Sequence, residues 1–170
     1  MNQSFERPIA VYRVNPATLW ASLFAALLLQ IFLPLVLPLA RLFDLPLLAV
    51  IYFALMKRNR VFGTVLGMGV GLLQDALSHG YIGMFGMAKA LVGYIAAWGS
   101  VKFNLEHTLP RFFLTASLIF VHSLILVGLR RALLQVPSLS QPLDLASAVL
   151  VNVALALILF PALDRFKEPA

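Results

Sequence analysis

The sequence contains no cysteine among its 170 residues and only seven acidic side chains. Without cysteine, neither a disulfide framework nor a thiolate metal site is available. Charged residues make up 12% of the chain against about 25% in soluble domains, and hydrophobic residues make up 61%. A chain this short has too much surface to bury so many apolar side chains in a water-soluble core. We therefore expect one integral membrane domain over 1–170, with the lipid bilayer as its solvent.

Motifs of common enzymes are also missing. The chain has no G-x-S-x-G, HExxH, P-loop or glycine-rich dinucleotide motif. His79, His107 and His122 form no i,i+4 ligand pair, so neither a metal nor a cofactor is expected. Ser100 and His122 leave an intramembrane protease formally open. We expect a protein that is not an enzyme.

Long uncharged runs predict an all-α polytopic protein. A helix needs about 20 apolar residues to cross the hydrocarbon core. Asn15 and Pro16 form a good helix start, and the hydrophobic run that follows them is too long for a signal-peptide core, which favours a retained signal anchor. The second expected helix is short, at about 18 Å, and is the weakest span. The six expected spans are 19–39, 45–56, 61–77, 81–101, 111–129 and 145–163.

The net charge of +6 fits membrane orientation better than nucleic-acid binding, because no basic stripe with interleaved aromatic residues is present. Six spans place both termini on one side. Nine cations fall on that side, namely Arg7, Arg13, Lys57, Arg58, Arg60, Lys102, Arg111, Arg165 and Lys167. The other side receives three, Arg41, Arg130 and Arg131. The positive-inside rule then predicts that both termini are cytoplasmic.

The third span carries small residues at every fourth position. Gly63, Gly67 and Gly71 are followed at the same spacing by Asp75, so all four lie on one helical face. The fourth span is also rich in small residues, including Gly83, Gly86 and Gly93. Missing side chains let helix backbones approach closely in lipid. Such a face serves either packing within the chain or docking of a partner helix, and the sequence leaves both open.

Asp75 and Lys89 are the two charges expected inside the membrane, where each is costly. If the third and fourth helices form a hairpin around Gly80, the axial mismatch between these side chains is about four residues or ~6 Å. A lysine side chain covers that distance, so the two residues could pair. A polar anchor for a partner helix, and a proton or ion site, are the alternatives. Gln74, beside Asp75, belongs to the same candidate interface.

The run GTVLGMGVGLLQDALSHGYIGMFG, from Gly63 to Gly86, resembles the bacterial rod-shape-determining membrane protein family MreD. In that family a glycine-rich third helix ends in G-L-x-x-D, here Gly71 to Asp75, and a short turn and re-entry follow. This chain has Tyr81 where a proline is frequent. The length, the six spans and the basic loop after the second helix also fit. The family is similar in helix arrangement to the substrate-binding subunits of energy-coupling-factor transporters.

The resemblance implies a multi-pass scaffold of the cell-elongation complex in the bacterial inner membrane, which supports peptidoglycan synthesis and cell shape. Its implied partners are the transmembrane helix of MreC, the MreB filament and the peptidoglycan glycosyltransferase–transpeptidase pair. The expected interface consists of Gly63, Gly67, Gly71, Gln74, Asp75, Gly83, Gly86, Lys89 and Gly93. The alternative is a small-molecule-binding subunit of a membrane transporter, with the VPSLSQP loop as a lid.

Overall fold

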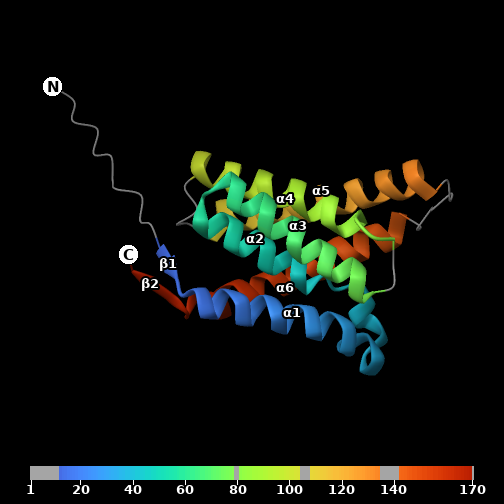
Figure 1. The fold of residues 1–170 in the computed structure, drawn as a ribbon, viewed down its shortest axis with the longest axis horizontal. Coiled ribbons are helices and arrows are strands. Elements are labelled where there is room, and N and C mark those ends of the chain that lie inside the picture. The colour runs from blue at the N-terminus through green and yellow to red at the C-terminus, as the bar shows by residue number, and fades with distance from the viewer. Residues whose placement is uncertain (1–11, 79–80, 104–107, 135–141, 170) are drawn as a thin grey trace.

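A computed structural model describes residues 12–78, 81–103, 108–134 and 142–169 (Figure 1). These residues form six α-helices, one 3-10 helix and two short strands. In chain order the elements are β1 (Tyr12–Val14), α1 (Pro16–Val36), η1 (Pro38–Leu42), α2 (Leu45–Lys57), α3 (Arg60–Leu77), α4 (Met84–Lys102), α5 (Thr108–Leu134), α6 (Pro142–Asp164) and β2 (Lys167–Pro169). The expected helical class is confirmed.

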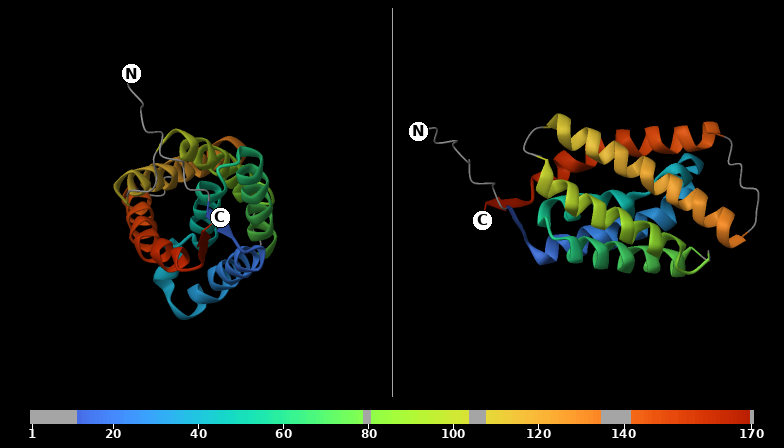
Figure 2. Two further views of the ribbon diagram at one scale, coloured as in Figure 1. Left: turned by 90° about the vertical axis from the view of Figure 1, so that its left-hand side faces the viewer. Right: turned by 90° about the horizontal axis from the view of Figure 1, so that it is seen from above.

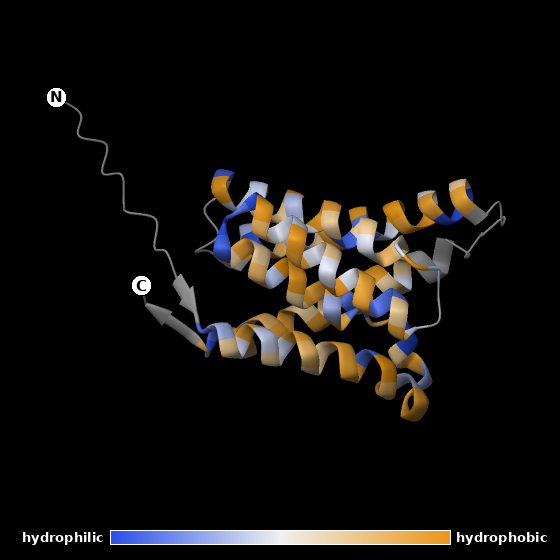
Figure 3. Ribbon diagram, viewed as in Figure 1, coloured by the Kyte–Doolittle hydropathy of each residue, from blue (hydrophilic) through white to orange (hydrophobic). Residues whose placement is uncertain are grey.

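Four of the helices are long and apolar enough to cross a membrane. They cover Pro16–Val36, Met84–Lys102, Leu109–Leu133 and Ala146–Asp164. Hydrophobic residues dominate these helices, and hydrophilic residues gather toward the helix ends and at a few interior positions (Figure 3). The chain is therefore a helical membrane protein. Consecutive α-helices run antiparallel to one another (Figure 1). Strand β1 pairs with β2 in antiparallel fashion, with Tyr12 opposite Pro169.

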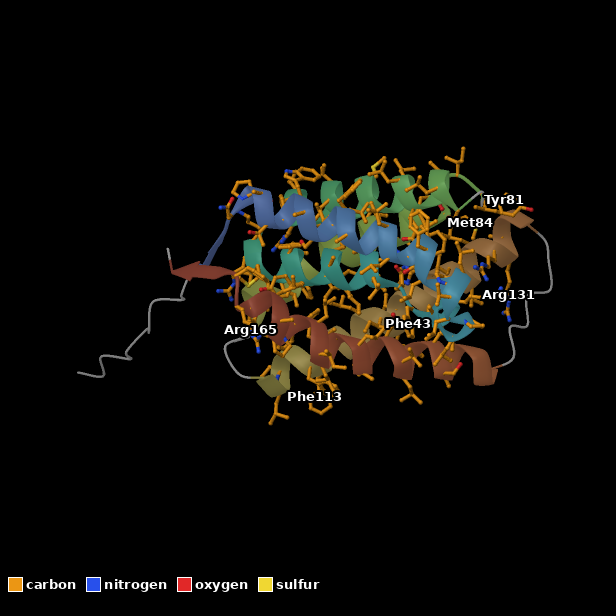
Figure 4. All side chains as sticks on the ribbon, turned by 90° about the horizontal axis from the view of Figure 1, so that it is seen from below. Phe43, Tyr81, Met84, Phe113, Arg131 and Arg165 are labelled. Carbon is orange, nitrogen blue, oxygen red and sulfur yellow. The ribbon has the colours of Figure 1, made fainter. Side chains whose placement is uncertain are left out.

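We call the end of the bundle that carries β1 and β2 the sheet end. The opposite end, with η1 and the connection from α3 to α4, is the far end. Tyr81, Met84 and Arg131 lie at the far end and Arg165 lies at the sheet end (Figure 4).

Helix α2 lies at the centre of the bundle, enclosed by the other helices (Figure 2, left). Ten consecutive residues, from Pro46 to Leu55, are buried. Because the other helices enclose it, α2 needs no contact with lipid, and at 13 residues it is shorter than the four helices that are long enough to cross a membrane.

Local sequence explains most helix ends. The side chain of Asn15 accepts a hydrogen bond from the Ala17 N–H at the start of α1, and Asn59 caps α3 in the same way through Phe62. Helix α1 ends at Val36 rather than at the expected position 39, because Pro38 disfavours helical backbone at the residue before it.

Three other expected boundaries also differ. Helix α4 begins at Met84 rather than at position 81, because Gly83 adopts a φ of 100°, which an α-helix does not allow. Helices α5 and α6 extend beyond the expected 111–129 and 145–163. His79, Gly80, His107 and most of the VPSLSQP loop lie outside the described residues.

Candidate functional site

The glycine face of α3 packs directly on α4. A Cβ atom added to Gly63, Gly67 or Gly71 would lie less than 3.0 Å from backbone atoms of Gly93, Lys89 and Phe85, respectively. The partner positions descend along α4 in steps of four as the glycines ascend along α3, so the two helices match in antiparallel register over a little more than two turns. No side chain larger than hydrogen fits at these three positions without separating the helices. We call this contact the glycine seam.

The small residues of α4 complete the seam. Gly93 meets the backbone of Gly63, and a Cβ on Gly86 would approach the Leu72 side chain at 3.0 Å. The seam glycines on both helices are buried. The chain itself therefore occupies this face, and a partner helix needs a different surface. Gly83 has open space around it, and its role is the turn into α4.

Asp75 binds the N-terminus of α4. Its carboxylate accepts hydrogen bonds from the N–H groups of Gly83 at 2.9 Å, Phe85 at 3.1 Å and Gly86 at 3.1 Å. The first N–H groups of a helix have no partner within it, and the helix dipole favours an anion there. Gly83, at the N-cap, has no side chain to offer. Asp75 therefore supplies from α3 the cap that α4 lacks, and it is 1% exposed.

Lys89 pairs with Asp44 and not with Asp75, a pairing that the sequence had left open. The Lys89 Nζ atom lies 2.8 Å from Asp44 Oδ1 and 2.6 Å from Oδ2. The seam register puts Lys89 opposite Gly67, eight residues or ~12 Å along α3 from Asp75. The backbone of α4 meanwhile satisfies Asp75. Lys89 is 0% exposed, so the ion pair stabilises a charge that would otherwise be costly at this position.

Asp44 lies where four helices converge on the turn before α2. Besides binding Lys89, its carboxylate accepts the Leu47 N–H at 3.0 Å and caps α2. Asn152 of α6 accepts the Asp44 N–H at 2.8 Å and donates to the Leu42 carbonyl. Gln30 of α1 donates to the Phe43 carbonyl and accepts the Leu45 N–H. We call Asp44, Gln30, Lys89, His122 and Asn152 the Asp44 hub.

His122 is the hub residue that comes from α5, the fourth of the converging helices. Its Nε2 atom lies 3.9 Å from Asp44 Oδ2 and has no hydrogen-bond partner among the described residues, although the side chain is buried. Its ring stacks on Phe85 with centroids 6.4 Å apart. Within the described ranges, no three His, Cys, Asp or Glu side chains gather as a metal site requires. The hub is a neutral ion pair with a histidine beside it.

The sequence reasoning did not find Asp44, Gln30 and Asn152 as site residues. Gln30 and Asn152 are single polar residues within long apolar helices, and an isolated polar residue inside a span marks a buried partner. Asp44 precedes Leu45-Pro46, which is a helix-start pattern. These signals indicated buried polar positions, but not that all of them meet at one turn.

A second polar cluster ties the helices together at the sheet end. Arg111 donates to both carboxylate oxygens of Asp164, at 2.7 and 3.2 Å, and the Tyr52 hydroxyl donates to the same carboxylate at 3.0 Å. The guanidinium also lies over the rings of Tyr52 and Phe160. Arg58, in the left-handed conformation that ends α2, donates to the Ser100 carbonyl of α4. The central helix is thus fixed at both ends by charged side chains.

Gln74 is the remaining candidate residue. It is 7% exposed, and its Oε1 atom has no hydrogen-bond partner in the part of the chain that the structure describes. It lines a cavity between α1, α3 and α4.

Comparison of the chain with protein families, with curated proteins and with solved structures gave no match.

Proposed function

We propose that this protein is a non-enzymatic scaffold of the bacterial cell-elongation complex, which binds the transmembrane helix of MreC in the inner membrane. The resemblance to the MreD family motivates this function. In such a complex the chain supports peptidoglycan synthesis and cell shape. MreB and the peptidoglycan glycosyltransferase–transpeptidase pair are the further partners that the resemblance implies.

The observation that carries the proposal is the coincidence of the resemblance with the glycine seam. The segment from Gly63 to Gly86 resembles MreD, and the same segment forms the contact between α3 and α4 and the Asp75 cap. A scaffold must present a surface of fixed shape to its partners. Two helices in backbone contact, with a carboxylate that fixes their register, are suited to present such a surface.

We propose that MreC docks on the outward face of α3, because the seam itself is filled. Val61, Val65, Met68 and Leu73 on this face are each more than half exposed. Gly69 lies among them, and a Cβ added there would meet nothing within 4 Å. A partner helix can therefore come close at Gly69 without any change in the chain.

A matched pair of glycine variants tests this docking face. Gly69→Leu should leave the fold intact and reduce co-purification with MreC, because the leucine occupies the space that the partner helix needs. Gly128→Leu on α5 is the control, since Gly128 also has open space around it. Equal recovery of MreC with both variants, at equal expression, would exclude the α3 face. Loss of MreC with both would exclude a specific contact at Gly69.

We further propose that all six helices cross the bilayer with the sheet end in the cytoplasm. The described cations at the sheet end include Lys57, Arg58, Arg60, Lys102, Arg111 and Arg165, while Arg41, Arg130 and Arg131 lie at the far end. This asymmetry follows the positive-inside rule.

The absence of native cysteine allows a clean test of this topology. Arg131→Cys should react with a membrane-impermeant maleimide in cells whose outer membrane is permeabilised. Lys57→Cys should react only after the inner membrane is also opened. The reverse pattern would overturn the proposed orientation.

The alternative function is a small-molecule-binding subunit of a membrane transporter. The cavity that Gln74 lines is the observation that favours it. A water-soluble ligand that raises the melting temperature of the purified chain would support this alternative, because binding to the folded state alone stabilises it.

A further inference from the structure

Three cations from three helices gather at the sheet end of the bundle. Lys57 ends α2, Arg60 begins α3 and Lys102 ends α4. Arg58, between the first two, donates to the Ser100 carbonyl and so holds the connection from α2 to α3 beside the last turn of α4. Hydrophilic residues mark this connection at the end of an otherwise apolar helix pair (Figure 3). We call Lys57, Arg60 and Lys102 the basic collar.

No carboxylate among the described residues neutralises the basic collar. All three of its side chains are exposed, and none of them forms an ion pair in the part of the chain that the structure describes. Asp164, the acid of the cluster at the same end, is already bound by Arg111. The collar is therefore a positive surface without a counter-charge, and such a surface attracts anions.

Stabilisation of the helix ends explains only part of this charge. Lys57 and Lys102 lie in the last turns of α2 and α4, where the helix dipole favours a cation. Arg60 lies in the first turn of α3, where the dipole disfavours a cation and where no acidic side chain is present. The cap of α3 comes from Asn59 instead, which accepts the Phe62 N–H. The position of Arg60 is thus unfavourable for the helix itself and favourable for an anion bound beside it.

The end of α4 has the features of a membrane interface. Trp98 lies one turn before Lys102, and the Lys102 Nζ atom lies 4.3 Å from the centroid of a ring of Trp98. Tryptophan and long cationic side chains gather at the level of lipid headgroups, where the apolar part stays in lipid and the charge reaches water. Leu91 and Tyr94 continue an exposed face of α4 toward the middle of the helix. A lipid whose headgroup lies at the collar can therefore place its acyl chains along α4.

We propose that the basic collar binds the phosphate of an anionic phospholipid, whose acyl chains lie along the exposed face of α4. A phosphodiester accepts charge-assisted hydrogen bonds from lysine and arginine. A zwitterionic phospholipid carries a cation of its own, which the collar repels, so the site selects its lipid by headgroup charge. This inference does not depend on whether the protein acts as a scaffold or as a transporter subunit, nor on which side of the membrane the sheet end faces.

The fluorescence of Trp98 reports which lipid lies next to the collar. The chain has two tryptophans, so Trp20→Phe leaves Trp98 as the only indole. The full chain is placed in vesicles of equal parts phosphatidylglycerol and phosphatidylcholine, and one of the two lipids carries brominated acyl chains, which quench a neighbouring indole. Exchanging the brominated lipid gives the ratio of the two binding constants at this site. We expect phosphatidylglycerol to be favoured about fivefold or more, which is the effect of at least one cation near the headgroup.

Variants that remove charge at the two ends of the bundle locate the effect. Lys57→Gln together with Arg60→Gln should reduce the preference to about twofold or less, because two of the three collar cations are lost. Lys102→Gln alone should also lower it, and this result decides the question if the double variant does not fold. Arg130→Gln together with Arg131→Gln is the matched control, because it removes two exposed cations at the far end and should leave the preference unchanged (Figure 4).

The outcomes separate a lipid site from general charge attraction. Equal quenching by the two brominated lipids would overturn the proposal and leave the collar to another anion, such as an acidic protein segment. An equal fall of the preference in the collar pair and in the far-end pair would also overturn it, because net charge would then set the preference. Glycerol phosphate added at constant ionic strength should not change the preference. A loss of preference on its addition would assign the collar to a soluble phosphate ester and refute the lipid site.

Discussion

The ion pair between Lys89 and Asp44 gives the sharpest test of the structure. Lys89→Met removes the ammonium group but keeps the length of the side chain. The Asp44 carboxylate, 13% exposed, then keeps only the Leu47 N–H as a close donor among the described residues. Removing one partner of a buried pair costs about 3–5 kcal/mol of unfolding free energy. Asp44→Asn should cost a similar amount, because it leaves the fully buried ammonium of Lys89 without its counter-charge.

The double variant should be much more stable than the two single changes suggest. With Asp44→Asn and Lys89→Met together no charge is left uncompensated, and asparagine can still cap α2. Replacement of a whole buried ion pair by neutral groups is often close to neutral, so we expect a cost below about 2 kcal/mol. The coupling energy of this double-mutant cycle is then about 4 kcal/mol or more. Equilibrium unfolding in a mild detergent, followed by the loss of helical circular dichroism, measures it.

A parallel cycle with Asp75 provides the control. Asp75 bonds to the backbone of α4 and interacts with Lys89 less strongly than Asp44 does, so the coupling energy of Asp75→Asn with Lys89→Met should be clearly smaller. Additive effects of Asp44→Asn and Lys89→Met would refute the ion pair. So would a stronger rescue of Lys89→Met by Asp75→Asn than by Asp44→Asn, because it would mean that Lys89 pairs within the α3–α4 hairpin.

Three further changes test other contacts by thermal unfolding in detergent. Gly67→Ala should destabilise the chain by about 1–3 kcal/mol, because its Cβ would collide with the α4 backbone. Gly69→Ala, where a Cβ has open space, should be neutral or slightly stabilising. Equal effects of the two changes would refute the glycine seam. Asp75→Ala should cost about 2 kcal/mol or more, since three N–H groups lose their acceptor, and Asp75→Asn should cost less because one oxygen remains. A smaller cost for alanine than for asparagine would contradict the capping role. Asn152→Leu should cost about 1–3 kcal/mol, because two backbone groups of the turn before α2 lose their partner, and an unchanged melting temperature would show that this bond is dispensable.

The helix starts show how far local sequence reaches. The Asn15-Pro16 start of α1 was predictable from two adjacent residues, and the structure confirms it. The start of α4 was not, because Tyr81 and Ile82 are apolar and continue the hydrophobic pattern. The positive φ of Gly83 decides that boundary, and it depends on the path of the connection from α3.

The partner of Lys89 is a feature that sequence reasoning left open. Spacing along a hairpin allowed a pair with Asp75, but the register of the glycine seam places Asp75 at the N-terminus of α4. Asp44 is 45 residues away in sequence and reaches Lys89 only because α2 packs in the centre of the bundle. Which side chains come into contact across such a separation cannot be inferred from the sequence without the packing of the intervening helices.

Composition and periodicity by themselves predicted that this chain is helical and embedded in lipid, and that its third helix carries a face of small residues suited to close backbone contact. They did so because burial in a bilayer forces backbone hydrogen bonds inside each helix and leaves a visible pattern of apolar and small residues. Only the tertiary structure decided which helix fills the glycine face and which carboxylate binds Lys89. It also decided that the shortest helix is central and that Gln74 borders a cavity. These features depend on helix register and packing between segments that are distant in sequence, and the one-dimensional pattern carries no record of either.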